Sequence, residues 1–403
     1  MPRRPMLLHW TPEESFMYEF LREYYSFGSS GRLQALFDHC NPSELTRQLI
    51  RKDVLPFFFA RLANGEVPLR LPSDLFRNWK ILSGQMALHN MVFERECARL
   101  VGLFQAAGIR SVLLKGFSHA KRLYGDNSQR PLQDLDFLIN AEDYALVKSL
   151  LLQDGYEYSA TCDDGTPLAP AELTLWEQLL KEMHFSKVQG CYHLNIDMHW
   201  GFSALWWAPV RSLYPLDQLH WLQFTEKAPL LHTAVEWFTP ELHFAQSIYH
   251  FALNNVFNGL KWFLDLCQYL ALMRDQLDWE LIGRFAPTRE CKLVFWIALM
   301  LVFEVTGPLK DQKVDRFVRE LHCSIPAPLL TLYKYRLFAG QSVVSKHVGS
   351  VLLPARWKDR LAVARFMLFD PAPMQLWNSA AARQTRMLQP VRIVSRLLRL
   401  ARR

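Results

Sequence analysis

The stretch that decides the fold is Asp134-Leu135-Asp136-Phe137-Leu138-Ile139, joined later in the chain by His193-Leu194-Asn195-Ile196-Asp197-Met198-His199-Trp200. Polar and apolar residues alternate in both stretches, which predicts two β-strands, because successive side chains of a strand point to opposite faces. Asp134 and Asp136 then share a face, and Asp197 lies on the polar face of the second strand. We expect the three carboxylates to face the same way and to form a hard-oxygen site that suits Mg2+.

A second motif, Val112-Leu113-Leu114-Lys115-Gly116-Phe117-Ser118, precedes these strands. It predicts a short apolar strand that breaks at Gly116 and continues into a helix over residues 117–124. Backbone N–H groups at a helix start can bind an anion closely, and a lysine adds positive charge. The sequence therefore predicts a phosphate-binding turn formed by Lys115, Gly116 and Ser118.

The order of these motifs resembles the uncharacterised nucleotidyltransferase family of the DNA polymerase β-type superfamily. The resemblance is carried by Leu-Leu-Lys-Gly at 113–116, Arg130-Pro131, the Asp134-x-Asp136 pair, Gly155-Tyr156 and Asp197-Met198-His199-Trp200, and more loosely by His250 and residues 260–265. The family's superfamily more often has a Gly-Gly or Gly-Ser pair nearer to the carboxylates, whereas here a lysine precedes the glycine.

The resemblance implies an α+β fold with a small mixed-sheet, polymerase β-like nucleotidyltransferase domain. It also implies transfer of NMP from an NTP, with ATP as the expected donor, to a hydroxyl group of an unknown acceptor. Two Mg2+ ions held by Asp134, Asp136 and Asp197 would clamp the attacking and leaving oxygens. Asp197 would also accept or relay the hydroxyl proton, and Lys261 would lie near the nucleotide phosphates.

Several of these residues have a second interpretation. Arg130 either reaches the triphosphate or caps its own loop. Lys261 and Asp265 are four residues apart on a predicted helix, so they can form an intrahelical pair. Asp134 and Asp136 themselves could be solvent-facing residues of an edge strand, although the preceding Lys-Gly turn favours the metal site.

Histidines lie close to Asp197 in the sequence. His199 shares its face and can orient the carboxylate, contact substrate or be structural. His184 and His193 could suggest zinc together with Asp197, but the chain has neither closely spaced thiolates nor a His-x-x-x-His helix. Zinc is therefore not favoured.

Hydrophobic periodicity divides the 403 residues into three parts. We expect a helical N-terminal region at 1–105, the nucleotidyltransferase catalytic domain at 106–205, and a helical C-terminal region at 206–403 that ends in a basic amphipathic segment. Single helices are expected over residues 42–62 and 240–271.

Composition indicates a folded chain, since 50% of its residues are hydrophobic and 13% are aromatic. Its seven cysteines are scattered without a Cys-x-x-Cys motif, which suits a reducing compartment. The longest apolar stretch, residues 293–303, is shorter than the roughly 20 residues that span a bilayer. We expect a cytoplasmic protein without a transmembrane helix.

Charge is unevenly distributed. Residues 331–403 hold 14 Lys and Arg against two Asp and Glu, a net charge of +12, which leaves −5 for residues 1–330. Residues 390–403 place arginines opposite apolar residues on a predicted helix. Such a segment can bind an anionic membrane surface peripherally or a nucleic acid, or can dock on the body by its apolar face.

Two rival functions use the same residues. A nucleotide-binding regulator or antitoxin-like interaction protein would keep the fold without turnover, and a γ-phosphoryl transferase would use the same metals on a different phosphate. The acceptor in a nucleotidyl transfer could be a small molecule, a sugar or glycan precursor, a protein or an RNA end.

The clustering of three acids gives a first prediction. Asp136→Asn should abolish activity, and should leave the melting temperature without Mg2+ unchanged or raised, because like charges repel. Thermal unfolding in EDTA measures this, and wild-type activity in the variant would contradict the metal assignment.

Overall fold

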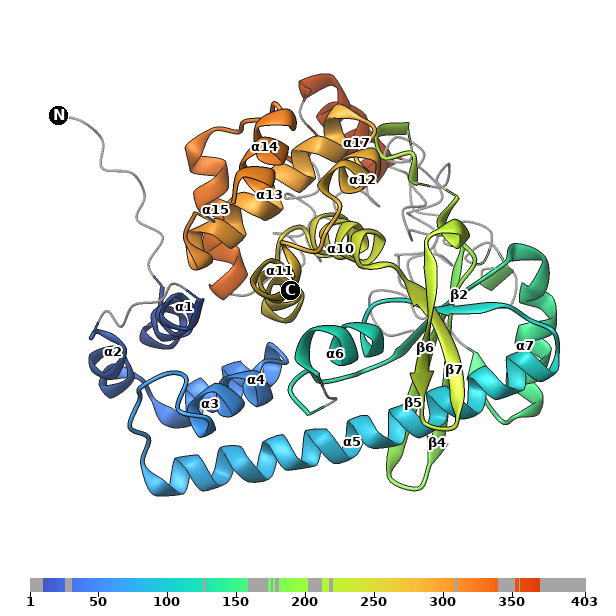
Figure 1. Ribbon diagram of the computed structural model, residues 1–403, viewed down its shortest axis with the longest axis horizontal. Helices are drawn as coiled ribbons and strands as arrows, with labels where there is room; N and C mark the ends of the chain where they lie inside the picture. Colours follow the sequence, from blue (N-terminus) through green and yellow to red (C-terminus); the bar gives the residue numbers. More distant parts are fainter. Residues whose placement is uncertain are drawn as a thin grey trace.

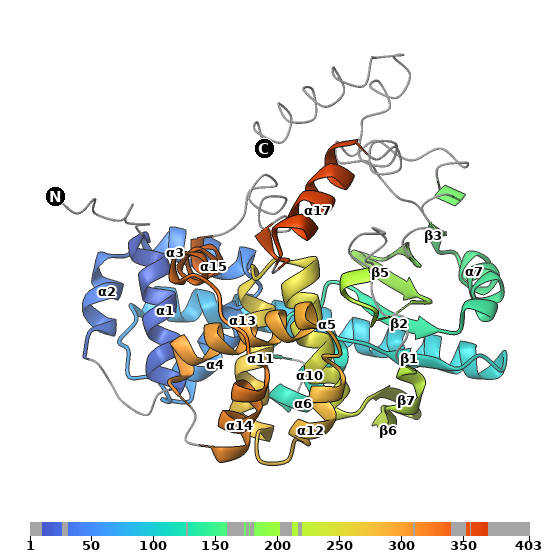
Figure 2. The same ribbon diagram turned by 90° about the horizontal axis from the view of Figure 1, so that it is seen from above.

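The computed structural model describes residues 10–25, 31–125, 128–158, 173–174, 177, 181–201, 212–216, 220–308, 311–339, 352–354 and 356–369. Helices occupy one side of the molecule and a mixed sheet the other (Figures 1 and 2). The expected α+β fold is confirmed.

Seven strands form one sheet in the order β3-β4-β5-β2-β1-β7-β6. Their bounds are β1 Ser111–Leu113, β2 Leu135–Ile139, β3 Glu157–Tyr158, β4 Glu182–Gln189, β5 Tyr192–His199, β6 Thr225–Leu230 and β7 Thr233–Phe238. The pairs β2/β5 and β1/β7 are parallel, and the other neighbours are antiparallel. The two predicted acidic strands are therefore direct neighbours at the centre of the sheet.

Helices of the first third of the chain are α1 Pro12–Tyr25, α2 Leu33–His39, α3 Pro42–Arg51, α4 Leu55–Ala63 and α5 Ser73–Ala106. Within the sheet region lie α6 Phe117–Tyr124, the 3-10 turn η1 Ala141–Asp143 and α7 Tyr144–Gln153. A second 3-10 turn, η3 Trp221–Gln223, precedes β6.

The remaining helices are α10 Pro240–Tyr249, the π-helical turn η4 His250–Asn254, α11 Leu260–Met273, α12 Trp279–Arg284, α13 Arg289–Thr306, α14 Gln312–Glu320, α15 Ala327–Ala339 and α17 Trp357–Phe369. They pack with α1–α4 into the helical side of the molecule (Figure 2).

Helix α5 joins the two sides, and in Figure 1 it runs beneath both of them. Its first half buries Trp79 in the core of the helical side, and its second half buries Phe93 and Phe104 against the sheet. One face of β2, with Leu135, Phe137 and Ile139, packs in the core that α5 and α7 share. The opposite face of β2, which carries Asp136, is directed toward the helical side.

The expected helices at 42–62 and 240–271 are each broken, which corrects the sequence-based prediction. The first breaks at Asp53, which has a positive φ of 56°, and the next helix starts with a proline in its first turn. The second breaks after the π-helical turn and restarts beyond Gly259, whose φ is 110°. Both breaks lie beside the acidic strands, as described below.

Residues beyond 205 were expected to be helical, and this was wrong for 225–238, where the β6–β7 hairpin extends the sheet by pairing with β1. One face of the hairpin is exposed and carries polar residues such as Glu226 and Glu236. These residues make the two strands hard to recognise from the sequence. The division into three domains at 105 and 205 stays a prediction.

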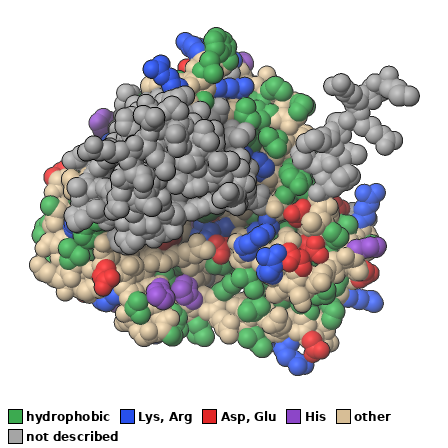
Figure 3. Space-filling view, turned by 180° about the vertical axis from the view of Figure 1, so that it is seen from behind, with side chains coloured by type: hydrophobic (Ala, Val, Ile, Leu, Met, Phe, Trp, Pro, Cys, Tyr) green, Lys and Arg blue, Asp and Glu red, His purple; other side chains and the backbone are tan. Residues whose placement is uncertain are grey.

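The face drawn in Figure 3 carries Lys and Arg side chains close to Asp and Glu side chains. None of the helices in the described part of the chain is both long and apolar enough to cross a membrane. The basic segment at 390–403 and most of the region 160–180 lie outside the described residues.

Candidate functional site

The centre of the site is the parallel pairing of β2 with β5, in which Asp136 lies directly opposite Asp197. Opposed residues of paired strands point to the same face of the sheet. Asp134 lies just before β2, two residues from Asp136, and its charge interacts with both other carboxylates. The structure therefore brings the three predicted acids together on one face.

Two cations neutralise the buried carboxylate of Asp136, which is 2% exposed. Nζ of Lys115 lies 2.8 Å from its Oδ1, and Nε2 of His199 lies 3.2 Å from the same oxygen. Burial would raise the pKa of Asp136, but Lys115 and His199 together hold it well below its usual value. Asp136 is therefore ionised and part of a compact charge cluster.

Asp134 behaves in the opposite way. Burial and the negative charge of Asp136 raise its pKa to about 6, and Lys115 offsets only part of this effect. The cations nearest to the cluster are thus taken up by Asp136, which leaves an excess of negative charge at Asp134. A bound divalent cation would remove this excess.

The Lys-Gly turn has the geometry that the motif predicts. Gly116 has a φ of 67°, a conformation that side chains rarely adopt, and a Cβ atom there would lie 3.7 Å from Oδ2 of Asp136. The turn leads into α6, whose first N–H groups have no partner within the helix. Burial lowers the pKa of Lys115, but Asp136, Asp134 and Asp197 outweigh burial and raise it above its usual value.

Ser118 is in a different position from the one expected. Its hydroxyl is fully buried, donates to the carbonyl of Leu114 and lies 2.8 Å from Nε2 of His243. The side chain therefore points into the core beneath α6. Only its backbone N–H group belongs to the helix start, so the geometry does not support a side-chain contact with phosphate.

Arg130 is also buried, at 3% exposure, and forms a two-bond pair with Asp265 of α11: Nε to Oδ1 is 2.8 Å and Nη2 to Oδ2 is 2.7 Å. Its Nη1 donates to the carbonyl of Gly116 at 3.2 Å. The guanidinium thus connects α11 to the Lys-Gly turn, so Arg130 supports that turn and not the loop in which it lies.

Lys261 does not pair with Asp265 on its own helix. Its Nζ lies 2.9 Å from Oδ2 of Asp53, at the break between α3 and α4, and its charge lowers the pKa of Asp134. Arg51, Lys52 and Trp262 line a pocket of about 490 Å³ together with Lys261 and Asp53. The pocket is therefore cationic, and its Asp53 accepts a hydrogen bond at 2.7 Å from Gln133, the residue before Asp134.

Glu182 and His184, both on β4, belong to the site although neither was predicted as a site residue. Nδ1 of His199 lies 3.2 Å from Glu182, and Nδ1 of His184 lies 2.5 Å from Oδ1 of Asp197. Despite burial, Glu182 raises the pKa of His199 to about 10, and Asp197 raises that of His184 to about 9. The two-residue turn at Gly190-Cys191 fixes this register, so the signal was present in the sequence.

Metal-ligand atoms converge at two overlapping places. The ligand atoms of Asp136, Asp197 and His199 lie within 4.8 Å of one another, and so do those of Glu182, His184 and Asp197. These groups can hold a metal ion, and Asp197 is common to both. Carboxylate oxygens fit Mg2+, while the imidazole nitrogens also allow metals such as Mn2+ or Zn2+.

Fold and site together define an α+β protein with a carboxylate cluster that can hold a metal ion beside a Lys-Gly turn. A family model described as uncharacterised nucleotidyltransferase matches residues 38–307, more than half of the chain, and the protein belongs to this family. The match includes the whole sheet and all of the site residues described above. Among curated proteins, none matches the chain.

The raised pKa of Asp134 predicts how the metal-free protein responds to pH. Because the folded state holds this proton up to about pH 6 and the unfolded state loses it near the usual aspartate pKa of about 3.9, the free energy of unfolding should fall as pH rises through this window. Asp134→Asn removes that loss, so its stability relative to wild type should rise by on the order of 2 kcal/mol between pH 4 and pH 7. Urea unfolding in EDTA measures this, with Asp74→Asn, at an exposed position, as the control. If the difference in stability between Asp134→Asn and wild type did not change with pH, the raised pKa of Asp134 would be contradicted.

For Asp136 the structure reverses the expectation from sequence. Asp136→Asn leaves Lys115 and His199 without their shared counter-charge in a buried place. The metal-free variant should lose roughly 3 kcal/mol of stability, the usual effect of removing one partner of a buried ion pair. Thermal unfolding in EDTA measures it, and an unchanged or raised melting temperature would show that repulsion dominates instead.

Arg130→Lys tests whether Arg130 supports the fold. A lysine cannot form the two-bond pair with Asp265 and also reach Gly116, so the variant should lose roughly 2–4 kcal/mol of stability. Arg77→Lys is the matched control, because Arg77 pairs with Asp74 at 3.8 Å on the exposed surface, where the change should be below about 0.5 kcal/mol. Wild-type stability with weakened nucleotide binding would instead identify Arg130 as a phosphate contact.

Proposed function

We propose that this protein is a Mg2+-dependent nucleotidyltransferase that moves NMP from an NTP, with ATP as the expected donor, to a hydroxyl group of an acceptor. The observation that carries the proposal is the register of β2 and β5, which sets Asp136 opposite Asp197 with the Lys115-Gly116 turn beside them. Family membership supports the class of reaction.

Asp134, Asp136 and Asp197 would hold the metal, which when bound neutralises charge on the phosphate oxygens. The donor set fits, since Asp134 carries an excess of negative charge and Asp136 and Asp197 converge. Lys115 would change its partner in this scheme. Its ammonium group now pairs with Asp136, and it would become available to the phosphates once a bound metal neutralises the carboxylates.

The start of α6 and the cationic pocket beside Asp134 would bind the rest of the triphosphate. The turn at Gly116 lets the phosphates approach the first N–H groups of α6, and Lys261 adds positive charge from the side of α11. Arg130 acts indirectly, by fixing the carbonyl of Gly116. Ser118 would contribute only its backbone N–H.

Asp197 would take the acceptor's hydroxyl proton. It is partly exposed, unlike Asp136, and His184 holds one of its oxygens at 2.5 Å. Within the described part of the chain no hydrogen bond to the second oxygen of Asp197 is found, and this oxygen would face a metal or a hydroxyl group. His199, between Asp136 and Glu182, orients the buried carboxylate.

Transfer of label from each α-labelled NTP to cell-extract components, with Mg2+, tests the proposal. Wild type should label an acceptor, and Asp197→Asn should reduce labelling by about 100-fold or more while nucleotide still binds, because a general base is worth on the order of 100-fold or more. Asp74→Asn, at a position 96% exposed, should behave as wild type.

The same assay separates the rivals. Transfer of γ-label without α-label would identify a phosphoryl transferase. Tight nucleotide binding with no labelled acceptor in any extract would favour a nucleotide-binding regulator.

A further inference from the structure

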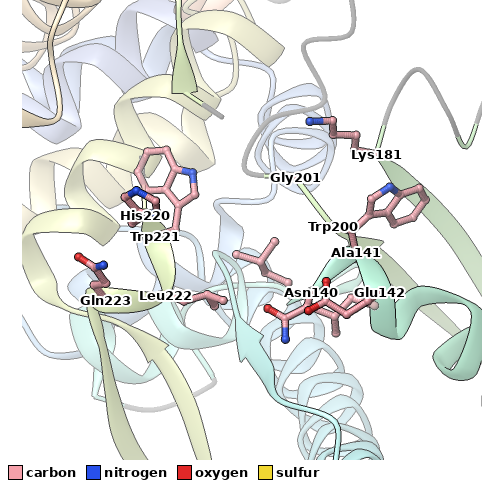
Figure 4. A pocket seen from close by; sticks show the side chains of 12 residues that line it. Asn140, Ala141, Glu142, Lys181, Trp200, Gly201, His220, Trp221, Leu222 and Gln223 are labelled. Carbon is pink, nitrogen blue, oxygen red and sulfur yellow. The ribbon is translucent and has the colours of Figure 1, made fainter. Parts of the chain in front are cut away.

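A second pocket, which shares no lining residue with the cationic pocket, lies at the carboxyl-terminal ends of the two acidic strands (Figure 4). It has a volume of about 370 Å³. Asn140 comes four residues after Asp136 and Gly201 four residues after Asp197, and both line the pocket. At about 3.3 Å per residue, its floor lies roughly 13 Å along the strands from the acids.

Two tryptophans line the pocket from different elements. Trp200 follows β5, and Trp221 belongs to η3 on the other side of the pocket (Figure 4). The ring of Trp200 is held by Tyr144, with ring centroids 3.9 Å apart, and Trp221 is only 7% exposed. Trp221 is thus part of the core and forms a wall of the pocket, whereas the partly exposed ring of Trp200, packed on Tyr144, can stack with a flat aromatic group.

Two amide side chains also line the pocket: in Figure 4 Asn140 lies between the indoles, and Gln223 lies on the side of Trp221 that faces away from Trp200. Asn140 donates to Asp143 at 3.2 Å and keeps its carbonyl oxygen on the pocket side, while Gln223 is exposed and has no side-chain hydrogen bond within the described part of the chain. An amide offers both a donor and an acceptor, as the edge of a nucleobase requires. Lys181 and Glu142 add one charge of each sign, so the pocket is close to neutral.

The side nearest to the acids is shaped by an unusual backbone. Lys181 has a positive φ of 55°, and its stem lies so close to Gly201 that a Cβ atom there would be 2.7 Å from Cδ of Lys181. Lys181 directly precedes Glu182, which holds His199. Pocket and carboxylates thus share one rigid wall, and strained conformations of this kind are often retained at binding sites.

We infer that this pocket is the nucleobase subsite of the enzyme, with the base stacked on Trp200, Trp221 closing the opposite side of the pocket, and the base edge read by Asn140 and Gln223. The inference rests on the proposed function and adds the place of the base to it. A nucleotide then lies along β2, with its phosphates at Lys115 and the cationic pocket and its base at the opposite end. The near-neutral pocket suits a base, and the cationic one suits phosphates.

The test uses the full-length protein and calorimetric titration with the α,β-methylene analogues of ATP, GTP, CTP and UTP, which cannot transfer NMP, and with inorganic tripolyphosphate. Trp200→Leu should weaken all four analogues about tenfold, because stacking is tolerant of base identity, and should leave tripolyphosphate binding unchanged. Gln223→Ala should change the ratio of affinities among the analogues by about fivefold or more, as expected for a lost base contact.

Matched controls are Trp357→Leu, at a position 73% exposed, and Gln153→Ala on α7, and both should bind as wild type. Wild-type affinity for all analogues in both pocket variants would overturn the subsite, and so would an equal loss of tripolyphosphate binding. A wild-type protein that binds none of the nucleotides would overturn the proposed function itself. Analogue binding that survives in the pocket variants leaves the function standing and refutes only the position of the base.

Discussion

The site depends on a single constraint, the pairing of two neighbouring parallel strands that places one carboxylate directly opposite another. Such a pair repels itself in a buried setting unless cations are near. The protein supplies them unevenly: Lys115 and His199 both bind Asp136, His184 binds Asp197, and Asp134 is left with a raised pKa. The protein thus neutralises most of the cluster with its own side chains, and uncompensated negative charge remains at Asp134.

The helical side of the molecule contributes more than a scaffold. Both helices that break unexpectedly place a charged residue beside the acids, Asp53 at one break and Lys261 just after the other, and these two residues pair across 2.9 Å. Asp265, one turn further along α11, binds Arg130 and through it the Gly116 carbonyl. Helix α11 therefore supports the Lys-Gly turn through Asp265 and Arg130, and binds Asp53 of the first helical region through Lys261.

The two pockets share no lining residue and differ in chemistry. The one beside Asp134 is lined by cations, and the one beyond Asn140 by indoles and amides. A nucleotide has the same division between a charged end and a flat, polar-edged end. In the proposed arrangement the reacting phosphorus lies between them, over the paired carboxylates, and the acceptor approaches from the partly exposed side of Asp197.

The sequence by itself determined the local pieces: the period of the two acidic strands, the Lys-Gly turn, helix α6 over residues 117–124, and the family, because these depend on alternation and on backbone preferences of neighbouring residues. The two-residue turn between β4 and β5 is also a feature of the sequence, and it sets the register that places Glu182 and His184 opposite β5. Only the tertiary structure decided that Arg130 binds Asp265, that Ser118 points into the core, and that Lys261 pairs with Asp53, which is 208 residues away in the chain. Those outcomes depend on which distant charges are buried together, and a pattern of neighbours carries no information about that.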